Sequence, residues 1–464
     1  MSAGTRTEMI TSRQADGKAA ARMRTTQIFF ASTLYGAVTL AAALDSGCFA
    51  PADRRMLLVS TNGPVPETAT PLDGMPGFER LRGRFDSVVS WNDTIAPLHP
   101  SGWSPRPDDI PLWERQLRLL WGLGEDRVEL VVESLQVAPA LSVAQLFPDA
   151  PLDVYADGLM SYGPTRNKLA PLVGERVRRV LHLDLVPGLT PLLLGEFGAV
   201  PRLVPTEAFT KVVAELAQDE EEPGLDAPVL LLGQYLSALG ILSPAEEEDL
   251  HLRMVRGAVV LGHSRLVFKP HPSAPAAWSK TLEREALALG AELTVLDRPV
   301  LAEVLYRQLR PALVVGCFST ALLTASTFYG IPVARIGTGM LLDRLTPYQN
   351  SNRVPVTLVD ALLPDLNDPA AVTDWAPPSA AQVRERVAGL IAAVGFAMQP
   401  QIRADLRGAA ERHLSERPTP DTWRYFTRRR LTILGLPGGL PVPRHAAVRR
   451  MARRARRLKR AALG

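Results

Sequence analysis

The chain has 464 residues, of which 46% are hydrophobic and 22% are charged, and it contains two cysteines, Cys48 and Cys317. This composition is that of a globular protein long enough for two or three domains, and it excludes collagen-like, coiled-coil and disulfide-stapled chains. The net charge of +4 is uneven, because nine arginines and lysines lie in residues 444–464 and the rest of the chain carries 4 − 9 = −5. A nucleic-acid binder would spread its positive charge over a face, so we expect no nucleic-acid partner.

The first residues of the chain have two parts. Residues 1–22 are polar and aperiodic, and we expect them to be disordered. The apolar stretch at residues 27–44 predicts a strand, a turn at Ser32 and Thr33, and a helix of small residues. A secretory signal is the alternative, since basic residues precede the stretch. We favour the strand, turn and helix because the same kind of alternation continues behind them.

Short apolar runs alternate with helical patterns over most of the chain, which is typical of parallel, doubly wound sheets. In the first half we expect strands at residues 56–60, 85–90, 128–132, 152–155, 178–183 and 200–204, and helices at 111–123 and 139–147. In the second half we expect strands at 229–232, 266–268, 293–296, 313–315 and 332–336, and helices at 244–260, 274–289, 300–309 and 320–329. The fold class is therefore α/β, with two Rossmann-like domains.

A change of composition separates the two halves. Residues 218–227 are acidic and contain a Pro-Gly pair, which is typical of a linker. We therefore expect an N-terminal domain at 23–217 and a C-terminal domain at 228–376, followed by a helical extension at 377–440 and a basic tail at 441–464. Two such domains face each other across a cleft, and ligands bind in clefts of this kind.

The sharpest local feature is the segment Lys269-Pro270-His271-Pro272, directly after a buried strand. A residue before proline is restricted to extended backbone, and the φ angle of proline is fixed. The segment therefore directs Lys269 and His271 at the carboxyl edge of the sheet, where doubly wound folds bind ligands. Histidine can transfer a proton near neutral pH. A loop histidine that only caps the backbone is the alternative.

Other polar residues of the second half follow strands in the same way. Ser319 and Thr320 lie between a strand and a helix and are natural N-cap residues. The N–H groups at such a helix start favour an anion, for example a phosphate, and capping alone is the alternative. Gly233 and Gln234 follow another strand, where they would either line the cleft or form an ordinary turn.

The first half places acids at the ends of strands. Asp157 precedes Gly158 and is a candidate general base across the cleft from His271, with an Asx turn as the alternative. Glu133 ends another strand. The further cleft candidates are Ser32, Thr33, Glu133 and Tyr162. The chain has no Walker A, GxGxxG, HExxH or CxxC motif and no Asp-x-Asp pair between apolar strands, so we expect neither a metal site nor a cofactor.

Three of these features together resemble a known family. Ala156-Asp157-Gly158, His271-Pro272 and Ser319-Thr320 are similar, in order and in domain placement, to motifs of the bacterial polysialyltransferases and lipooligosaccharide sialyltransferases. The resemblance covers roughly residues 25–345. It departs at one position, because the family has a second acid where this chain has Ala156.

The resemblance implies a GT-B fold, in which the N-terminal domain is the acceptor side and the C-terminal domain binds the nucleotide sugar. It also implies an inverting, metal-independent transfer of sialic acid, or a related nonulosonic acid, from a CMP-activated donor to a glycan acceptor. In this reading Asp157 and His271 are catalytic. The donor-binding residues would be Lys269, Pro272, Ser319, Thr320, Gly233 and Gln234.

Two other functions fit the same plan. One is another GT-B nucleotide-sugar enzyme, either a UDP-sugar transferase or an epimerase. The other is a catalytically silent protein at a membrane surface. Residues 446–462 predict a basic helix with a thin apolar stripe, which suits an anionic membrane face, and a solvated tail is the alternative. We expect a cytoplasmic protein that is peripheral on the inner membrane face if the tail binds there.

Overall fold

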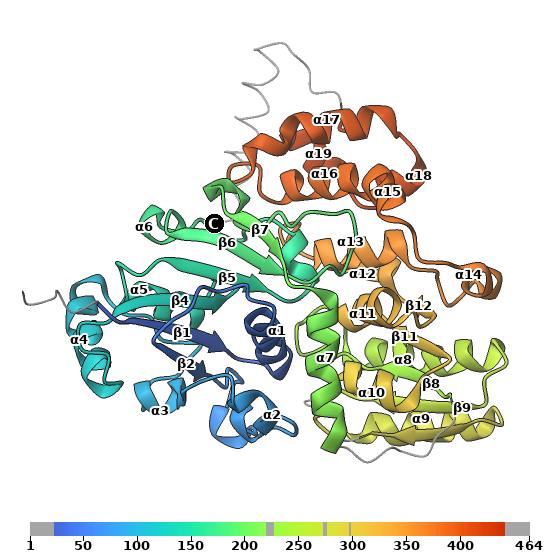
Figure 1. Cartoon of the computed structure of the whole chain (residues 1–464). Helices are drawn as coiled ribbons and strands as arrows, with labels where there is room; N and C mark the ends of the chain where they lie inside the picture. Colours follow the sequence, from blue (N-terminus) through green and yellow to red (C-terminus); the bar gives the residue numbers. More distant parts are fainter. Residues whose placement is uncertain (1–22, 220–226, 272–275, 297, 441–464) are drawn as a thin grey trace, which may run out of the picture.

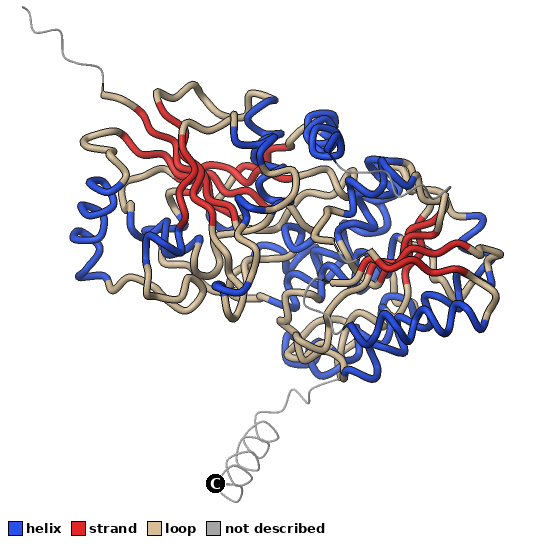
Figure 2. Tube along the Cα trace, turned by 90° about the horizontal axis from the view of Figure 1, so that it is seen from below, coloured by secondary structure: helices blue, strands red, loops and turns tan. Residues whose placement is uncertain are grey.

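The computed structural model describes residues 23–219, 227–271, 276–296 and 298–440. The expected disorder of residues 1–22, the tail helix at 446–462, Pro272 and most of the linker lie outside the described residues. Within them, the chain forms two parallel sheets, one in each half (Figure 1). Figure 2 shows the two sheets side by side, separated by a layer of helices.

The first sheet has seven parallel strands in the order β3-β2-β1-β4-β5-β6-β7. Its strands are β1 (Thr25–Ala31), β2 (Arg54–Val59), β3 (Ser87–Ser90), β4 (Arg127–Glu133), β5 (Leu152–Ala156), β6 (Val177–His182) and β7 (Val200–Leu203). Its helices are α1 (Leu34–Asp45), α2 (Glu79–Arg82), α3 (Trp91–Ile95), α4 (Ile110–Leu120), α5 (Ala140–Leu146), α6 (Pro171–Gly174) and α7 (Thr206–Leu216). The central strands read as continuous apolar runs because helices cover both faces.

Strand β1 shows how the sheet divides its two layers. Side chains alternate between the faces of a strand. Phe29 packs with α1 and α7 on one face, whereas Ile28 and Phe30 pack with α3, α4 and α5 on the other. All three side chains are fully buried. The segment expected to be a strand, a turn and a helix is thus confirmed as β1, the turn at residues 32–33 and α1.

The second sheet has five parallel strands in the order β10-β9-β8-β11-β12. Its strands are β8 (Val229–Leu232), β9 (Arg265–Lys269), β10 (Glu292–Val295), β11 (Leu313–Gly316) and β12 (Val333–Arg335). Its helices are α8 (Pro244–Val260), α9 (Ala276–Ala288), α10 (Ala302–Leu309), α11 (Thr320–Tyr329), α12 (Thr338–Arg344) and α13 (Arg353–Leu362). The strand order reverses between β1 and β4 in the first sheet and between β8 and β11 in the second. The carboxyl edges of both sheets face the boundary between the halves (Figure 1).

Helix α7 joins the two halves. The ring of Phe209 in α7 lies 5.3 Å from Tyr35 of α1 and 5.7 Å from Phe328 of α11. One buried apolar cluster therefore runs from the first sheet through α7 into the second. This α7 was not predicted from the sequence, although its apolar positions have helical spacing.

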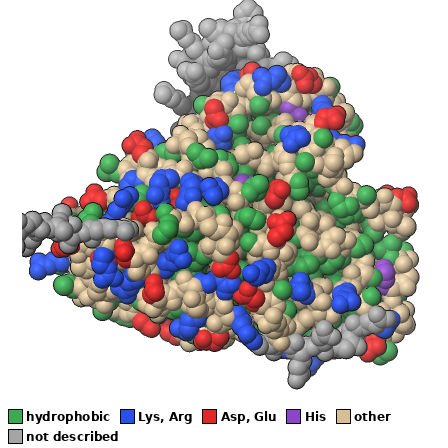
Figure 3. All heavy atoms as spheres, in the orientation of Figure 1, with side chains coloured by type: hydrophobic (Ala, Val, Ile, Leu, Met, Phe, Trp, Pro, Cys, Tyr) green, Lys and Arg blue, Asp and Glu red, His purple; other side chains and the backbone are tan. Residues whose placement is uncertain are grey.

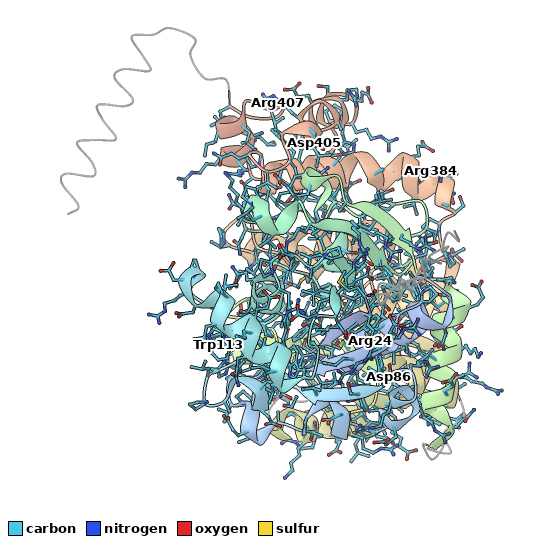
Figure 4. The ribbon with its side chains drawn as sticks, turned by 60° about the vertical axis from the view of Figure 1, so that its left-hand side comes forward. Arg24, Asp86, Trp113, Arg384, Asp405 and Arg407 are labelled. Carbon is cyan, nitrogen blue, oxygen red and sulfur yellow. The ribbon has the colours of Figure 1, made fainter. Side chains whose placement is uncertain are left out.

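A helical extension packs on top of the first sheet (Figures 1 and 4). It contains α15 (Ala380–Val383), α16 (Gly389–Met398), α17 (Arg407–Glu416), α18 (Pro420–Trp423) and α19 (Arg428–Leu434), whereas α14 (Pro369–Asp374) precedes it and lies beside the second domain (Figure 1). The buried Arg403 links the extension to the first domain, because one guanidinium nitrogen donates to the carbonyl of Leu192 at 2.7 Å. Another nitrogen pairs with Asp405 of the extension, also at 2.7 Å. In the described residues no helix is long and apolar enough to cross a membrane.

The predicted fold class is confirmed, and the expected strands and helices are present. Their ends differ by a few residues. Helix α4, for example, stops at Leu120 and not at residue 123, because Gly122 and Gly124 adopt positive φ angles of 61° and 50°. Figure 3 shows many Lys and Arg side chains on the first domain, away from the second. Arg179 and Arg178 there pair with the buried Asp153.

Candidate active site

A cavity of about 510 Å³ lies at the carboxyl edges of both sheets. Polar residues from both halves of the chain line it, among them Ser32, Thr33, Asn62, Glu133, Gln136 and Asp157 from the first, and Gln234, Ser319 and Thr320 from the second. Each follows or ends a strand, so the sheets deliver them to one place. The structure therefore brings together most of the residues that the sequence singled out.

Glu133 is held in place at the end of β4. Its carboxylate accepts hydrogen bonds from the backbone N–H of Ser32, at 3.2 Å, and from the Ser32 hydroxyl. The Tyr155 hydroxyl lies 3.3 Å from the same carboxylate and 3.0 Å from the carbonyl of Phe30. Burial raises the pKa of Glu133, and these hydrogen bonds partly oppose the increase.

Asp157 follows β5 and lies beside the first turn of α1. A Cβ atom on Gly36 would be only 3.3 Å from Oδ2 of Asp157 and 2.9 Å from the Tyr155 hydroxyl, so glycine leaves room for both groups. Burial, and then the nearby Glu133 carboxylate, raise the pKa of Asp157 to about 7. A carboxylate with this pKa can accept a proton at neutral pH and is suited to general-base catalysis.

The turn after Glu133 carries backbone strain. Ser134 and Leu135 have positive φ angles of 50° and 46°, in the left-handed region that residues other than glycine rarely adopt. Such strain is concentrated at functional sites. The turn brings Gln136 to the cavity, a residue that the sequence analysis missed. Asn62 was missed too, although it follows β2 and the rule of strand ends would have found it.

The second domain contributes the first turn of α11. Ser319 is its N-cap, and its hydroxyl accepts from the N–H of Ala321 at 3.2 Å. The side chain of Gln234 accepts from the N–H of Phe318 at 3.0 Å and ties the loop after β8 to this turn. The helix start therefore faces the cavity with backbone N–H groups and hydroxyls, which can accommodate an anion.

The two halves touch directly beside Asp157. The backbone N–H of Leu159 donates to the Thr320 hydroxyl at 3.3 Å. A Cβ atom on Gly158 would lie 3.2 Å from the same hydroxyl oxygen, so the close approach depends on glycine. The loop that carries the candidate base thus rests on the first turn of the candidate anion site.

Lys269 and His271 lie on the other side of the cleft. Lys269 lines a second cavity of about 430 Å³, which shares Ser32, Thr33 and Asn62 with the first. Desolvation lowers the pKa of Lys269, and Glu303 partly opposes this. The pKa of His271 is lowered by desolvation and then by the Lys269 ammonium. In the described part of the chain His271 lines neither cavity, and its ring packs 6.1 Å from that of Tyr235.

Two further candidates have packing roles in the structure. Gly233 donates its N–H to the carbonyl of Lys269 at 2.9 Å, and a Cβ atom on it would be 2.8 Å from the ring of Phe268. Tyr162 is fully buried, and its hydroxyl accepts from the N–H of Val186 at 3.1 Å. Neither lines the first cavity within the described residues. The same described residues contain no group of three His, Cys, Asp or Glu side chains placed to hold a metal ion.

Comparison with known structures gives distant similarities. The GT-B domain of a sialyltransferase from Photobacterium damselae matches with 12% identity and a TM-score of 0.39, over 72% of this chain and 96% of its own. The UDP-GlcNAc 2-epimerase of Methanocaldococcus jannaschii matches with 12% identity and a TM-score of 0.43, over 76% and 91%. A mutant O-GlcNAc transferase of Thermobaculum terrenum matches with 16% identity and a TM-score of 0.35, over 87% of this chain but only 65% of its own.

Comparison of sequences is more specific. No curated protein matches the chain. The family model of alpha-2,8-polysialyltransferase (POLYST) matches residues 27–338, a range that includes Asp157, His271, Ser319 and Thr320. This range is more than half of the chain, and it confirms the resemblance to sialyltransferase-like glycosyltransferases that the sequence motifs indicated. The chain belongs to the alpha-2,8-polysialyltransferase family.

Proposed function

We propose that the protein transfers sialic acid, or a related nonulosonic acid, from a CMP-activated donor to a hydroxyl of a glycan acceptor, with inversion at the anomeric carbon. The observation that supports this most is the contact between Leu159 and Thr320, which holds the loop of Asp157 against the start of α11. The Asp157 carboxylate, the candidate proton acceptor, and the start of α11, the candidate anion site, therefore line one cavity. A glycosyl transfer that releases a phosphate needs these two features.

The roles of the residues follow from this geometry. Ionised Asp157 takes the proton from the acceptor hydroxyl, whose oxygen then bonds to the anomeric carbon of the donor. The bond between that carbon and the phosphate oxygen of CMP breaks, and the phosphate keeps the electron pair. Ser319, Thr320 and the N–H groups of α11 stabilise the charge of the departing phosphate. No step of this mechanism requires a metal ion.

His271 would act as a hydrogen-bond donor to the phosphate. Its lowered pKa makes the neutral imidazole the main form at pH 7, and a neutral ring still donates through one N–H. The negative charge of a bound phosphate would raise this pKa again and favour proton donation. Lys269 would respond to the same charge in the same direction.

The function is tested with the purified full chain and CMP-sialic acid. Mass spectrometry of a sialylated acceptor should show a donor-dependent gain of one or more sialic acid units, with and without EDTA. CMP, but not UDP, should raise the melting temperature, because a ligand stabilises the state that it binds. Stabilisation by UDP alone would indicate a UDP-sugar enzyme. A product that disappears in EDTA and returns with magnesium would contradict metal independence.

The basic tail is proposed to attach the enzyme to an anionic membrane surface, as a peripheral protein of the inner membrane face. Nine basic residues between 444 and 464 support this, at about 1 kcal/mol for each basic residue near such a surface. Deletion of residues 441–464 should release the protein from vesicles rich in anionic lipid while transfer to a free acceptor continues. Equal vesicle binding by the full and the shortened chain would contradict the attachment.

A further inference from the structure

A buried carboxylate lies behind the side of the cleft that the second domain forms. Glu247, in the first turn of α8, is fully buried. Within the described residues it forms no ion pair, and its carboxylate accepts from the backbone N–H of Leu236 at 2.6 Å and from that of Ser237 at 2.8 Å. Each oxygen thus has one N–H partner. Because a buried charge is costly unless it is paired, these two bonds tie the carboxylate to the loop after β8.

Glu247 is not needed to cap its own helix. The first turn of α8 already has a complete capping box, in which the hydroxyl of Ser243 accepts from the N–H of Glu246 at 3.3 Å. The carboxylate of Glu246 accepts in return from the N–H of Ser243 at 2.8 Å. The role of Glu247 therefore lies in the loop that its side chain holds.

This loop carries two residues of the donor side, Gln234 and Tyr235, directly before Leu236. The Gln234 side chain lines the cavity of about 510 Å³ and accepts from the N–H of Phe318 at 3.0 Å, next to the N-cap of α11. The ring of Tyr235 lies 6.1 Å from that of His271. One loop, fixed by one carboxylate, thus contacts both the candidate anion site and the histidine of the Lys-Pro-His-Pro segment.

Helix α8 also supports Tyr235 through a group of aromatic rings. His251 lies one turn after Glu247 on the same face of α8. Its buried ring packs 5.3 Å from Phe268 of β9 and 5.8 Å from Trp278 of α9, and Trp278 lies 5.9 Å from Tyr235. Burial lowers the pKa of His251 to about 4, so its ring is neutral at pH 7 and serves as a packing group.

We propose that Glu247 is a positioning residue of the donor side. By fixing the loop after β8 it sets the position of Gln234 at the start of α11 and of Tyr235 against His271, and thereby the affinity of this side for a donor phosphate. Glu247 acts through these residues, since in the described part of the chain it lines neither cavity of the cleft. The inference rests on the proposed function for the identity of the ligand, whereas the order of the loop does not depend on it.

The charge of Glu247 also acts on His271. Desolvation and the Lys269 ammonium on β9 lower the pKa of His271, and the Glu247 carboxylate on α8 opposes them. Loss of this carboxylate should therefore lower the pKa of His271 further and leave less of the protonated form for a phosphate.

The first test needs no ligand. Glu247→Gln keeps the shape of the side chain but turns an amide donor toward one of the two N–H groups of the loop. Hydrogen exchange of the full chain, followed by mass spectrometry, should become about tenfold faster in peptides that cover residues 233–237 and 317–321. Asp153→Asn, which alters an equally buried carboxylate of the first domain, is the matched control and should leave both peptides unchanged.

The second test asks whether Glu247 acts through Gln234. Calorimetry with CMP should show affinity weakened about tenfold in Glu247→Gln and about tenfold in Gln234→Leu. The double variant should lose far less than the roughly 100-fold of two independent effects, because both changes release the same hold on α11. A residue that only stabilises the fold would give independent losses. Asp153→Asn should bind CMP as the wild type does.

The outcomes separate this inference from the proposed function. Unchanged exchange at both peptides in folded Glu247→Gln protein, or equal changes in Asp153→Asn, would overturn the positioning role. Multiplicative losses in the CMP experiment would overturn its action through Gln234. If Glu247→Gln does not fold, Glu247→Asp, whose shorter carboxylate cannot reach both N–H groups, takes its place. A wild type that does not bind CMP would contradict the proposed donor, while the exchange experiment would still decide the role of Glu247.

Discussion

The two sides of the candidate catalytic cleft carry opposite kinds of ionisable groups, acids on one side and bases on the other. Desolvation shifts the pKa values on both sides. On the first domain, burial raises the pKa values of Asp157 and Glu133. On the second domain, desolvation lowers the pKa values of the half-buried Lys269 and of His271, although His271 itself is exposed. In all four groups desolvation favours the neutral form. Desolvation therefore opposes charge on both sides of the cleft.

Because desolvation opposes charge on both sides, a bound ligand of opposite charge would favour the ionised form of the groups beside it. A phosphate near α11 would stabilise the cationic forms of Lys269 and His271, because a nearby opposite charge favours the ionised form. The acidic side is rigid, because Ser32 and Tyr155 hold Glu133 by direct contacts. The basic side includes the segment around His271, whose ring contacts Tyr235. The first side is thus suited to proton transfer and the second to binding charge.

The largest effect is expected from Asp157→Asn, which removes the proposed proton acceptor and keeps the size of the side chain. Transfer should fall by about 10²–10⁴-fold, the range for a general base. In the wild type, kcat should rise as the pH increases through about 7, where Asp157 loses its proton. Initial rates with CMP-sialic acid from pH 5 to 9 measure both. Activity retained in a folded Asp157→Asn protein would place the base elsewhere, with Glu133 as the next candidate.

The same substitution should increase stability, which serves as its control. The pKa of Asp157 is raised from 3.8 to about 7, so the folded state binds the proton more tightly than the unfolded state. The wild type therefore loses stability as the pH rises from about 4 to 7. The asparagine of the variant does not titrate, so the melting temperature of Asp157→Asn should exceed that of the wild type at pH 8, and the difference should shrink toward pH 5. A lower melting temperature at pH 8 would argue against a buried carboxylate that is costly to ionise.

His271→Ala tests the other side of the cleft. We expect a loss of transfer of about 10²-fold, because the departing phosphate loses a hydrogen-bond donor. Since the imidazole is mainly neutral, His271→Asn, which also donates an N–H, should restore part of the rate. Wild-type activity in a folded His271→Ala protein would remove this residue from the mechanism. Equal rates for the Ala and Asn variants would show that a proton, and not a hydrogen bond, is needed.

The sequence predicted the scaffold of the site well, because buried parallel strands are long apolar runs and their last residues share one edge. Asp157, Glu133, Ser319 and Thr320 were found by this rule and line one cavity. Gln136 could not be found, since its turn adopts positive φ angles at Ser134 and Leu135 without any glycine to mark them.

The cavity of about 710 Å³ between the first domain and the helical extension was also beyond prediction from the sequence. It depends on how the extension packs on the first domain, through long-range contacts such as that of Arg403 with Leu192. Tyr162 illustrates the converse, because it follows the acidic motif closely in sequence yet its hydroxyl turns inward to the backbone of Val186. Proximity in sequence does not determine which way a side chain points.

Glu133→Gln is expected to have a smaller effect than either catalytic substitution. It removes the nearest negative charge from Asp157, so the rise of kcat should shift to lower pH. The other titratable groups that face Asp157 are the hydroxyls of Tyr155 on β5 and Tyr35 on α1, which stay protonated over this range. A pH–rate profile with an unchanged midpoint would show that Glu133 does not affect the pKa of Asp157 and only positions Ser32.

The smallest effect is expected from Thr320→Val, which tests the contact between the two sides. The substitution keeps the shape of the side chain but removes the hydroxyl that accepts from the N–H of Leu159 at 3.3 Å. One neutral hydrogen bond contributes about 1 kcal/mol, so affinity for CMP and kcat should each fall by about three- to tenfold. Thr327→Val is the matched control, because its hydroxyl also crosses between the halves, to the carbonyl of Leu185 at 3.2 Å, but lies away from the cavity. If the two variants lose activity equally, the contact at Thr320 serves only to join the domains. A loss confined to Thr320→Val would show that this hydroxyl acts at the site of the departing phosphate, either by binding the phosphate or by holding the loop of Asp157 against it.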